Sequence, residues 1–386
     1  MNMYNFDEII NRRGTHCVKW DIDTDPQVIP LWVADMDFKV APCIQKALEK
    51  RIKHGIFGYT EVPSEYYKAT IQWFKKKHNW TIDKEQIIYT SGVVPAMSAV
   101  IKAYCQKGDK ILVQTPVYNC FFSSIRNNDC QTEDSPLVLK GNKYEIDFED
   151  FERHAKDERV KIFLLCNPHN PAGRVWSKEE LKRLGEICKR NNVLVVSDEI
   201  HCELVFDKKT YTPFASLGKS FAHNCVVLCS PTKSFNMAGL QIANIICPDA
   251  TAYEKINKAI NINEICDVNP LGVEALIAAY TQGGTWIDEL NKYIEGNYKL
   301  LSSFVAKQFP KLKLIEMEGT YLAWLDVSAL GKSSDEICKA LLEKAKVRLN
   351  PGTMYGADGF VRINLATSQG LLQEALIRIQ KSGVLN

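Results

Sequence analysis

The chain has 386 residues, enough for a large hydrophobic core and for two domains. Apolar residues make up 46% and charged residues 24%, as in an ordinary globular protein, and the formal net charge is only +2 at pH 7. This balance argues against a nucleic-acid-binding or membrane-surface protein, both of which carry a strong charge bias.

The sequence carries no recognisable signal for export or membrane insertion. No apolar run approaches the roughly 18 to 20 residues that span a bilayer. The N-terminal MNMYNFDEII lacks a basic region followed by an apolar one. Thirteen cysteines are scattered through apolar stretches such as FLLC, and no CxxC pair occurs. These features predict a cytoplasmic protein whose thiols are reduced and buried.

Strand and helix patterns alternate over residues 46–286. QIIYTS, DKILVQ, KIFLLC, VLVVSDE and CVVLCS predict buried strands. VPAMSAVIKAYC and SKEELKRLGEICKRNN predict helices, and the second begins with Ser177 and Glu180 in capping-box spacing. This alternation predicts a large α/β domain with a mostly parallel sheet that is covered on both faces.

The pattern changes at about residue 286. TWIDELNKYIEGNYKLLSSFVAKQF predicts a long helix, and the segments LKLIEME, TYLAWLDV and GFVRINLA follow it. Residues 287–386 are therefore predicted to form a smaller α+β domain. Residues 1–45 fit neither pattern, and we expect them to join the small domain.

Several short motifs resemble known ligand sites but lack an essential residue. GKS occurs twice, and each copy lacks the glycine five residues earlier that a phosphate-binding P-loop requires. The DxDxD stretch resembles a calcium loop, but Pro26 and Trp32 replace its glycine and its glutamate. No GxGxxG or HExxH occurs, and the seven histidines are not clustered, so we predict no metal site.

Polar and aromatic residues follow several of the predicted strands, at the edge where open α/β sheets bind ligands. Gly92 lets the backbone approach a ligand closely, and the free N–H groups of the following helix form an anion site. The alternative is an ordinary strand-to-helix turn. Tyr118 can stack on a planar ring or simply pack, and NPHNP presents the amide side chains of Asn167 and Asn170.

Two charged residues stand out in apolar surroundings. Asp198 ends an almost wholly apolar strand, which implies a buried positive partner. Lys233, in SPTKSFNMAGLQ, has no carboxylate among its sequence neighbours. Pyridoxal 5'-phosphate would account for both: its aldehyde suits Lys233, its ring nitrogen Asp198, its phosphate the Gly92 turn and its ring Tyr118.

The chain resembles the fold-type I pyridoxal-phosphate enzymes, and among them the cystathionine β-lyase group of bacterial C–S lyases (the MalY/PatB type). The resemblance extends over nearly the whole chain, in the motifs RRGTHCVKWD, PLWVADMDF, HGIFGYT, SGVVPAM, NPHNPAGRVW, SDEIHCELVF, SPTKSFNMAGLQ, LNPGTMYG and GFVRINLATS. It implies the fold-type I transferase fold and a homodimer with shared active sites.

The resemblance also implies roles for matching residues. Lys233 would hold the cofactor as a Schiff base and move the substrate's Cα proton. Asp198 would pair with the ring nitrogen, and Tyr118 would stack on the ring. His201 and Asn170 would lie near the ring hydroxyl.

The phosphate and the substrate carboxylate would be bound by further residues. The implied phosphate ligands are Gly92, Val93, Val94 and Ser230, with Tyr59 from a second subunit. Arg362 would hold the substrate α-carboxylate in a two-pronged contact, helped by Asn170 and by the backbone near Val33 and Ala34. Gln241 stands where many aminotransferases carry a phosphate-binding arginine, which agrees with the lyase group.

The activity that this resemblance implies is α,β-elimination from cystathionine, cysteine or related S-substituted cysteines, which yields a thiol, pyruvate and ammonia. A class I/II aminotransferase would use the same residues but reprotonate the cofactor carbon. A third alternative is a non-catalytic regulator that binds the cofactor, which would normally need an added DNA-binding domain. The expected partners are a small amino acid and a second copy of the chain, with neither nucleic acid nor membrane.

Overall fold

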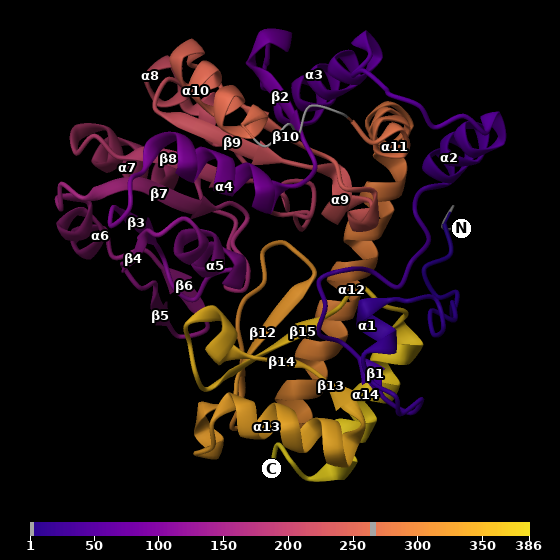
Figure 1. Cartoon of the computed structure of the whole chain (residues 1–386). Helices are drawn as coiled ribbons and strands as arrows, with labels where there is room; N and C mark the ends of the chain where they lie inside the picture. Colours follow the sequence, from indigo (N-terminus) through magenta and orange to yellow (C-terminus); the bar gives the residue numbers. More distant parts are fainter. Residues whose placement is uncertain (1–3, 263–267) are drawn as a thin grey trace.

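The apolar runs of the first two thirds of the chain assemble into one seven-stranded sheet in the computed structural model, which describes residues 4–262 and 268–386 (Figure 1). The strands are, in spatial order, β2 (Ile87–Thr90), β10 (Ala243–Ile246), β9 (Cys225–Cys229), β8 (Leu194–Asp198), β7 (Val160–Cys166), β3 (Lys110–Val113) and β4 (Gln131–Asp134). The five strands from β9 to β4 are parallel, whereas β10 runs antiparallel to both neighbours. The predicted mostly parallel sheet is confirmed.

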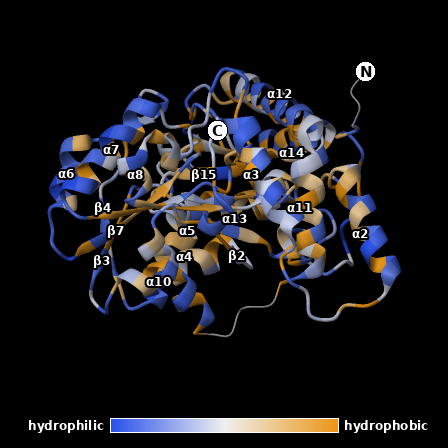
Figure 2. Cartoon of the chain, turned by 90° about the horizontal axis from the view of Figure 1, so that it is seen from above, coloured by the Kyte–Doolittle hydropathy of each residue, from blue (hydrophilic) through white to orange (hydrophobic). Residues whose placement is uncertain are grey.

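Both faces of the sheet are covered, because successive strand residues belong to different apolar clusters. Phe163 and Leu165 of β7 pack in one cluster, while Leu164 between them packs in the other. One cluster includes residues of α3 (Ser64–His78), α6 (Phe148–Ala155), α7 (Lys178–Arg190) and α11 (Pro270–Gln282). The other includes residues of α4 (Val93–Tyr104), α5 (Asn119–Asn127) and α10 (Ala250–Asn261). Figure 2 shows hydrophobic strands such as β7 and largely hydrophilic outer helices such as α6 and α7.

The helix predicted after Ser177 begins as expected. The Ser177 side chain accepts from the N–H of Glu180, and the Glu180 side chain accepts from the N–H of Ser177. This capping box satisfies N–H groups that have no partner inside the helix. Further elements of this part of the chain are the helix α2 (Pro42–His54) and the short elements β5 (Val138–Lys140), β6 (Lys143–Glu145), α8 (Lys219–Ala222) and α9 (Pro231–Ser234).

The last third of the chain begins with the long helix α12 (Gly284–Gln308) and then forms a second, smaller sheet. Its antiparallel strands are β11 (Lys313–Leu314), β12 (Leu322–Asp326), β15 (Phe360–Asn364) and β14 (Asn350–Pro351). Helices α13 (Ser334–Ala340) and α14 (Gln369–Ser382) complete this α+β unit. The segment LKLIEME yields only the two-residue β11, which is shorter than predicted.

The N-terminal segment lies against this smaller unit. After α1 (Val18–Asp21), β1 (Ile29–Pro30) pairs in parallel with β13 (Val347–Arg348). The precise division into residues 1–45, 46–286 and 287–386 stays a prediction. In the described ranges, no helix combines the length and the apolar character needed to cross a membrane.

Candidate active site

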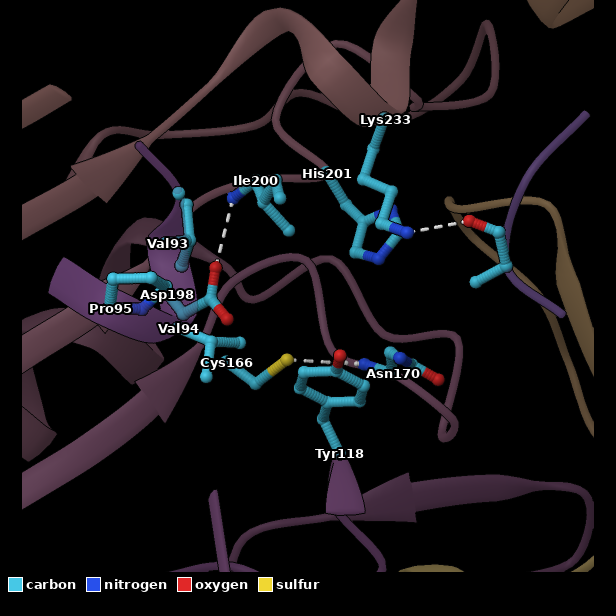
Figure 3. A pocket seen from close by; sticks show the side chains of 12 residues that line it. Val93, Val94, Pro95, Tyr118, Cys166, Asn170, Asp198, Ile200, His201 and Lys233 are labelled. Carbon is cyan, nitrogen blue, oxygen red and sulfur yellow. Dashed lines mark hydrogen bonds between the residues drawn. The ribbon is translucent and has the colours of Figure 1, made fainter. Parts of the chain in front are cut away.

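Most residues that the sequence singled out line one cavity at the carboxyl ends of the strands, as Figure 3 shows. The lining residues are Ala34, Gly92, Val93, Val94, Pro95, Tyr118, Cys166, Asn170, Asp198, Ile200, His201 and Lys233. They come from distant parts of the sequence, and the parallel strands β7 and β8 bring Cys166 and Asp198 to the same edge of the sheet. The predicted convergence of strand ends thus gives one site.

Lys233 lies on the short helix α9, whose N-cap is Ser230. Its Nζ donates a hydrogen bond to the backbone carbonyl of Ala34 at 2.6 Å. Within the described ranges, Lys233 forms no ion pair with a carboxylate. Burial and the nearby Arg362 guanidinium lower the pKa of Lys233 to about 8. Near pH 8, about half of the lysine is therefore a neutral amine, which is the form that can attack a carbonyl or accept a proton.

Asp198 is the last residue of β8 and is 4% exposed. Its Oδ1 accepts one hydrogen bond, from the N–H of Ile200 at 3.1 Å. Burial raises the pKa of Asp198 to about 7. Because a cation beside a carboxylate favours its charged form, a positively charged ligand would restore Asp198 to the ionised state. In Figure 3 its carboxylate and the Lys233 ammonium lie at opposite sides of the cavity.

The remaining polar lining groups are neutral. Burial lowers the pKa of His201 to about 3, so its imidazole is uncharged, and its Nδ1 is buried without a hydrogen-bond partner. Tyr118 is the N-cap of α5, and burial raises the pKa of its hydroxyl. The side-chain oxygen of Asn170 accepts a hydrogen bond from Arg362 at 3.2 Å. The Nδ1 of His201 is therefore a buried polar atom without a partner in a residue that lines the cavity.

The N-terminus of α4 faces the cavity with Gly92 as its N-cap, and no side chain caps it. The first N–H groups of a helix have no partner inside it and carry the positive end of the helix dipole, so they bind anions. The backbone of Gly92 is extended, with φ 175°, and a Cβ there would lie 3.3 Å from Cδ of Pro95. Close packing of this turn thus favours glycine.

Four predicted site residues do not line the cavity. Arg362 on β15 is buried behind Asn170, and its Nη2 donates to the carbonyl of Trp32 at 2.9 Å. Ser230 donates to the carbonyl of Ile242 at 2.5 Å, and the carbonyl of Val33 accepts from Asn364 at 2.5 Å. Tyr59 is 96% exposed and lies away from the cavity within this chain.

Two buried side chains that hold the backbone of residues 33–35 beside the cavity were not predicted from the sequence. Asn364 is wholly buried and donates to the carbonyls of both Val33 and Asp35. Tyr321 is also wholly buried and donates to the carbonyl of Ala34 at 2.9 Å. Asn364 follows Arg362 by two residues on a strand, so both point to the same face. This two-residue spacing from Arg362 could have predicted Asn364 as a site residue. The segment GTYLAW contains no comparable feature that predicts a role for Tyr321.

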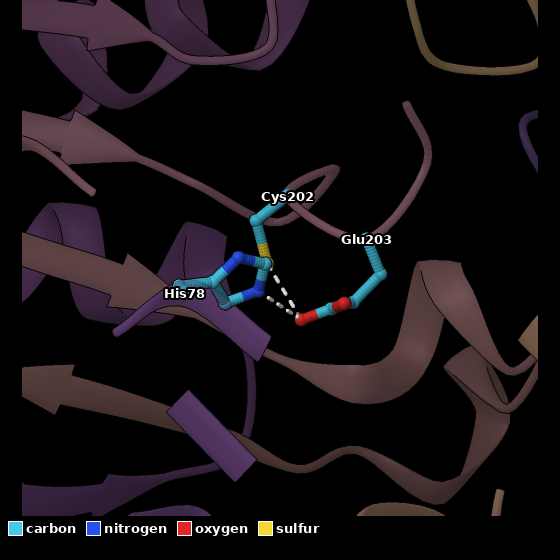
Figure 4. Close-up of side chains that lie close together, drawn as sticks. All are labelled: His78, Cys202 and Glu203. Carbon is cyan, nitrogen blue, oxygen red and sulfur yellow. Dashed lines mark hydrogen bonds and ion pairs between the residues drawn. The ribbon is translucent and has the colours of Figure 1, made fainter. Parts of the chain in front are cut away.

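Among the described residues, His78, Cys202 and Glu203 bring potential metal ligands within 4.8 Å of one another, and Figure 4 shows their arrangement. Glu203 already accepts hydrogen bonds from Trp73 at 2.6 Å and from His78 at 2.8 Å. Burial raises the pKa of Cys202, which keeps it a thiol rather than the thiolate that binds metals. The trio therefore serves as a hydrogen-bonded anchor between α3 and the loop after β8.

A lysine and an aspartate in one cavity, beside an uncapped helix N-terminus at a sheet edge, define a site of the fold-type I class. The family model for aminotransferase class I and II matches residues 26–379, and the chain belongs to this family. The resemblance found in the sequence is thereby confirmed.

Individual relatives match over nearly their full lengths. Cystathionine β-lyase PatB of Bacillus subtilis (strain 168) is 42% identical over 382 residues, which cover 97% of this chain and 99% of PatB. Cystalysin of Treponema denticola, solved with a pyridoxal 5'-phosphate cofactor, superimposes with a TM-score of 0.96 at 34% identity and 98% coverage of both chains. The pyridoxal-phosphate-bound C–S lyase of Staphylococcus hominis gives 0.92 at 35% identity, also with 98% coverage of both.

Proposed function

We propose that this protein is a pyridoxal-phosphate-dependent C–S lyase of the cystathionine β-lyase type. It converts cystathionine, cysteine or related S-substituted cysteines into a thiol, pyruvate and ammonia. The observation that carries the proposal is that Lys233 and Asp198 share one cavity and that, among the described residues, neither has an oppositely charged partner at hydrogen-bond distance. The similarity to PatB and to the C–S lyase of Staphylococcus hominis supports the choice of reaction.

The residues of the cavity fit this cofactor. The uncapped N-terminus of α4 suits its phosphate, and the Asp198 carboxylate suits a protonated ring nitrogen. The unpartnered Nδ1 of His201 and the amide of Asn170 are available to its ring hydroxyl. Tyr118 offers an aromatic face to its ring. Bound there through Lys233, the cofactor supplies an electron sink for the bond that breaks at the substrate Cα.

The chain's own residues carry the proton and hold the substrate. The Lys233 amine accepts the proton from the substrate Cα, since its lowered pKa leaves much of it neutral near pH 8. Asp198 holds the proton on the ring nitrogen. Arg362 has no carboxylate partner in the described part of the chain, and its guanidinium binds the substrate α-carboxylate beside Asn170.

Two outcomes compete once the Cα proton has been removed. Loss of a β-thiolate needs no long-range proton movement, whereas transamination requires Lys233 to deliver its proton to a second carbon. Gln241, which replaces the arginine of many aminotransferases, is exposed and is not among the residues that line the cavity. We therefore favour elimination over the aminotransferase alternative.

Product analysis distinguishes the two reactions. Incubation of the enzyme with cystathionine, without a keto acid, should release pyruvate and thiol in many-fold molar excess over the enzyme. Alanine, which has no β leaving group, should give only slow conversion of the cofactor to its amine form. If cystathionine is consumed only when a keto acid is added, and an equal amount of a new amino acid forms, the protein is a transaminase.

The active form that we propose is a cytoplasmic homodimer in which Tyr59 reaches the phosphate of the partner's site. Ile56 and Phe57, just before Tyr59, are more than half exposed, as is Ile52 at the end of α2. Such a run of exposed apolar side chains is typical of a protein interface. This segment would be covered in the dimer, which accounts for its exposure in one chain.

Subunit mixing tests this assembly. Y59F and K233A subunits should each be impaired alone, and mixed dimers should recover some activity because one of their two sites contains both native residues. Size-exclusion chromatography and exchange of labelled subunits verify that mixed dimers form. No recovery despite demonstrated exchange, with Y59F itself badly impaired, would contradict the shared site.

A further inference from the structure

Residues 32–38 form an irregular, bent segment, here called the strap, whose backbone carbonyls serve as acceptors for side chains around the active site. Arg362 and Asn350 donate to Trp32, and Asn364 donates to Val33 and Asp35. Asn236, three residues after Lys233, donates to Met36 and Phe38. These bonds fix the strap on both sides of Ala34 without using the Ala34 carbonyl.

The Ala34 carbonyl accepts two hydrogen bonds, from Lys233 Nζ at 2.6 Å and from the Tyr321 hydroxyl at 2.9 Å. Tyr321 is wholly buried, and its ring packs edge-on against His201, with centroids 5.9 Å apart. Burial also raises the pKa of Tyr321, so that its hydroxyl keeps its proton. Figure 3 shows the Lys233 side chain pointing away from Asp198.

We propose that Tyr321 is a positioning residue that shares the Ala34 carbonyl with Lys233 and limits how firmly that carbonyl holds the lysine ammonium. A carbonyl oxygen has two lone pairs, and a donor on one of them weakens the bond on the other. Whenever Lys233 is not bonded to the cofactor, its ammonium donates to the Ala34 carbonyl, which also accepts from Tyr321. The ammonium then loses its proton more readily than it would if Tyr321 did not donate to the same oxygen. The inference rests on the proposed role of Lys233 and adds a residue to that site.

Other charged and titratable groups also act on Lys233. The groups that face it are Arg362 on β15, Asp35 in the strap, Cys120 on α5, Asp198 at the end of β8 and His201 beyond it. A Y321F substitution leaves all of these in place and removes only the hydroxyl. Hydrogen bonding to the charged form of a group favours that form. Without the Tyr321 hydrogen bond, the Ala34 carbonyl should therefore bind the Lys233 ammonium more strongly.

The test measures Lys233 ionisation directly in the full chain without cofactor. Acetic anhydride reacts with neutral amines, so the rate of Lys233 acetylation against pH, read by peptide mass spectrometry, gives its pKa. Y321F should raise that pKa by a few tenths to about one unit, which means up to about tenfold slower labelling below the pKa. In the holoenzyme, the acid limb of kcat should move to higher pH by a similar amount.

The matched control is Y298F. Tyr298 also donates to a backbone carbonyl, that of Ile315 at 3.1 Å, but in contact with Phe206 and Met317 rather than with the site. It should leave the Lys233 labelling curve unchanged. If Y321F does not fold by circular dichroism, a ring-fluorinated tyrosine at position 321 replaces it. This stronger donor should move the Lys233 pKa downward instead.

An unchanged or lowered pKa in Y321F, or an unchanged or raised pKa with the fluorinated tyrosine, would overturn the proposal. The labelling result does not depend on turnover. If the pKa shifts as expected but the holoenzyme releases no pyruvate from cystathionine, the proposed lyase function fails while the inference about Tyr321 stands.

Discussion

Asp198 and Glu318 are both buried carboxylates, with 4% and 2% of each residue exposed, yet their surroundings are opposite. Glu318 accepts hydrogen bonds from Lys143 at 2.6 Å and Lys209 at 2.7 Å, and from Arg174 at 3.0 Å. Burial alone would raise the pKa of Glu318, but these cations lower it to about 2. Asp198 has a single backbone N–H, and burial raises its pKa to about 7.

This difference in partners indicates that the Glu318 carboxylate has a structural role and that the Asp198 carboxylate has a functional one. The carboxylate of Glu318 is satisfied within the chain and joins segments that are distant in sequence, since Lys143 and Lys209 come from the larger unit. In the part of the chain that the structure describes, no cation at hydrogen-bond distance compensates the desolvation of Asp198, and burying such a charge is costly. A group of this kind persists where a ligand supplies the missing charge, as we propose for the cofactor ring.

The largest expected effect comes from removing the amine that would join this ligand to the chain. K233A should lower cystathionine turnover by at least about a thousandfold, or about 4 kcal/mol of barrier, because no other group takes the Cα proton. Borohydride reduction of the native holoenzyme should attach the cofactor to Lys233, as shown by peptide mass spectrometry. Attachment to a different lysine would show that the site has been misassigned.

The structural carboxylate should affect stability rather than chemistry. E318Q should lower the free energy of unfolding by about 3 kcal/mol, because it removes the buried charge that Arg174, Lys143 and Lys209 contact. The matched control E295Q breaks the exposed Lys299–Glu295 pair and should cost less than about 1 kcal/mol. Because the folded pKa of Glu318 lies below its unfolded value, the native protein should lose this stabilisation as the pH falls from about 4.5 to about 2, whereas E318Q should not.

The functional carboxylate should affect the rate. D198N keeps the shape of the side chain but cannot hold the proton on the cofactor ring nitrogen. We expect kcat to fall by at least about a hundredfold, which corresponds to about 2.7 kcal/mol. Steady-state kinetics with cystathionine provide the measurement, and E318Q, assayed well below its melting temperature, should keep a nearly native kcat. A near-native rate in D198N would remove the distinction between the two carboxylates.

Much of the site could be predicted because its residues break local sequence patterns. Asp198 ends an apolar strand, and Gly92 and Pro95 lie in the turn between a strand and a helix. Each of these residues could therefore be recognised from the sequence alone. Five of the seven strands of the large sheet followed from apolar runs, and the order of the parallel strands brought these residues together. The strands β4 and β10 were not predicted: β4 has the polar sequence QTED, and β10 is only four residues long.

The parts that sequence could not reveal depend on backbone groups and on long-range packing. The fold brings Lys233 and Tyr321 to the Ala34 carbonyl of the strap, although these residues lie 199 and 287 positions away from Ala34 in the sequence. Glu318 was equally hidden, since its cations lie 109 to 175 residues away. A backbone carbonyl has no sequence signature, and a distant ion pair leaves no local pattern.

The smallest expected effect is also the most direct comparison of the two carboxylates, and it is seen in protein freed of cofactor. Since the folded pKa of Asp198, about 7, lies above its ordinary value of 3.8, the folded state binds the extra proton between these values. Stability should therefore fall as the pH rises from about 4 to 7, the opposite of the Glu318 contribution. D198N lacks this titration, so at pH 8 it should melt at least about 2 °C above the cofactor-free wild type, and at pH 5 the gap should close.

Adding pyridoxal phosphate should reverse the order of the two melting temperatures, because the ring cation stabilises the native carboxylate and not the amide. Thermal denaturation at the two pH values, with and without cofactor, makes the measurement. If cofactor-free D198N melts below the wild type at pH 8, Asp198 is already satisfied by the protein itself, and the contrast with Glu318 fails.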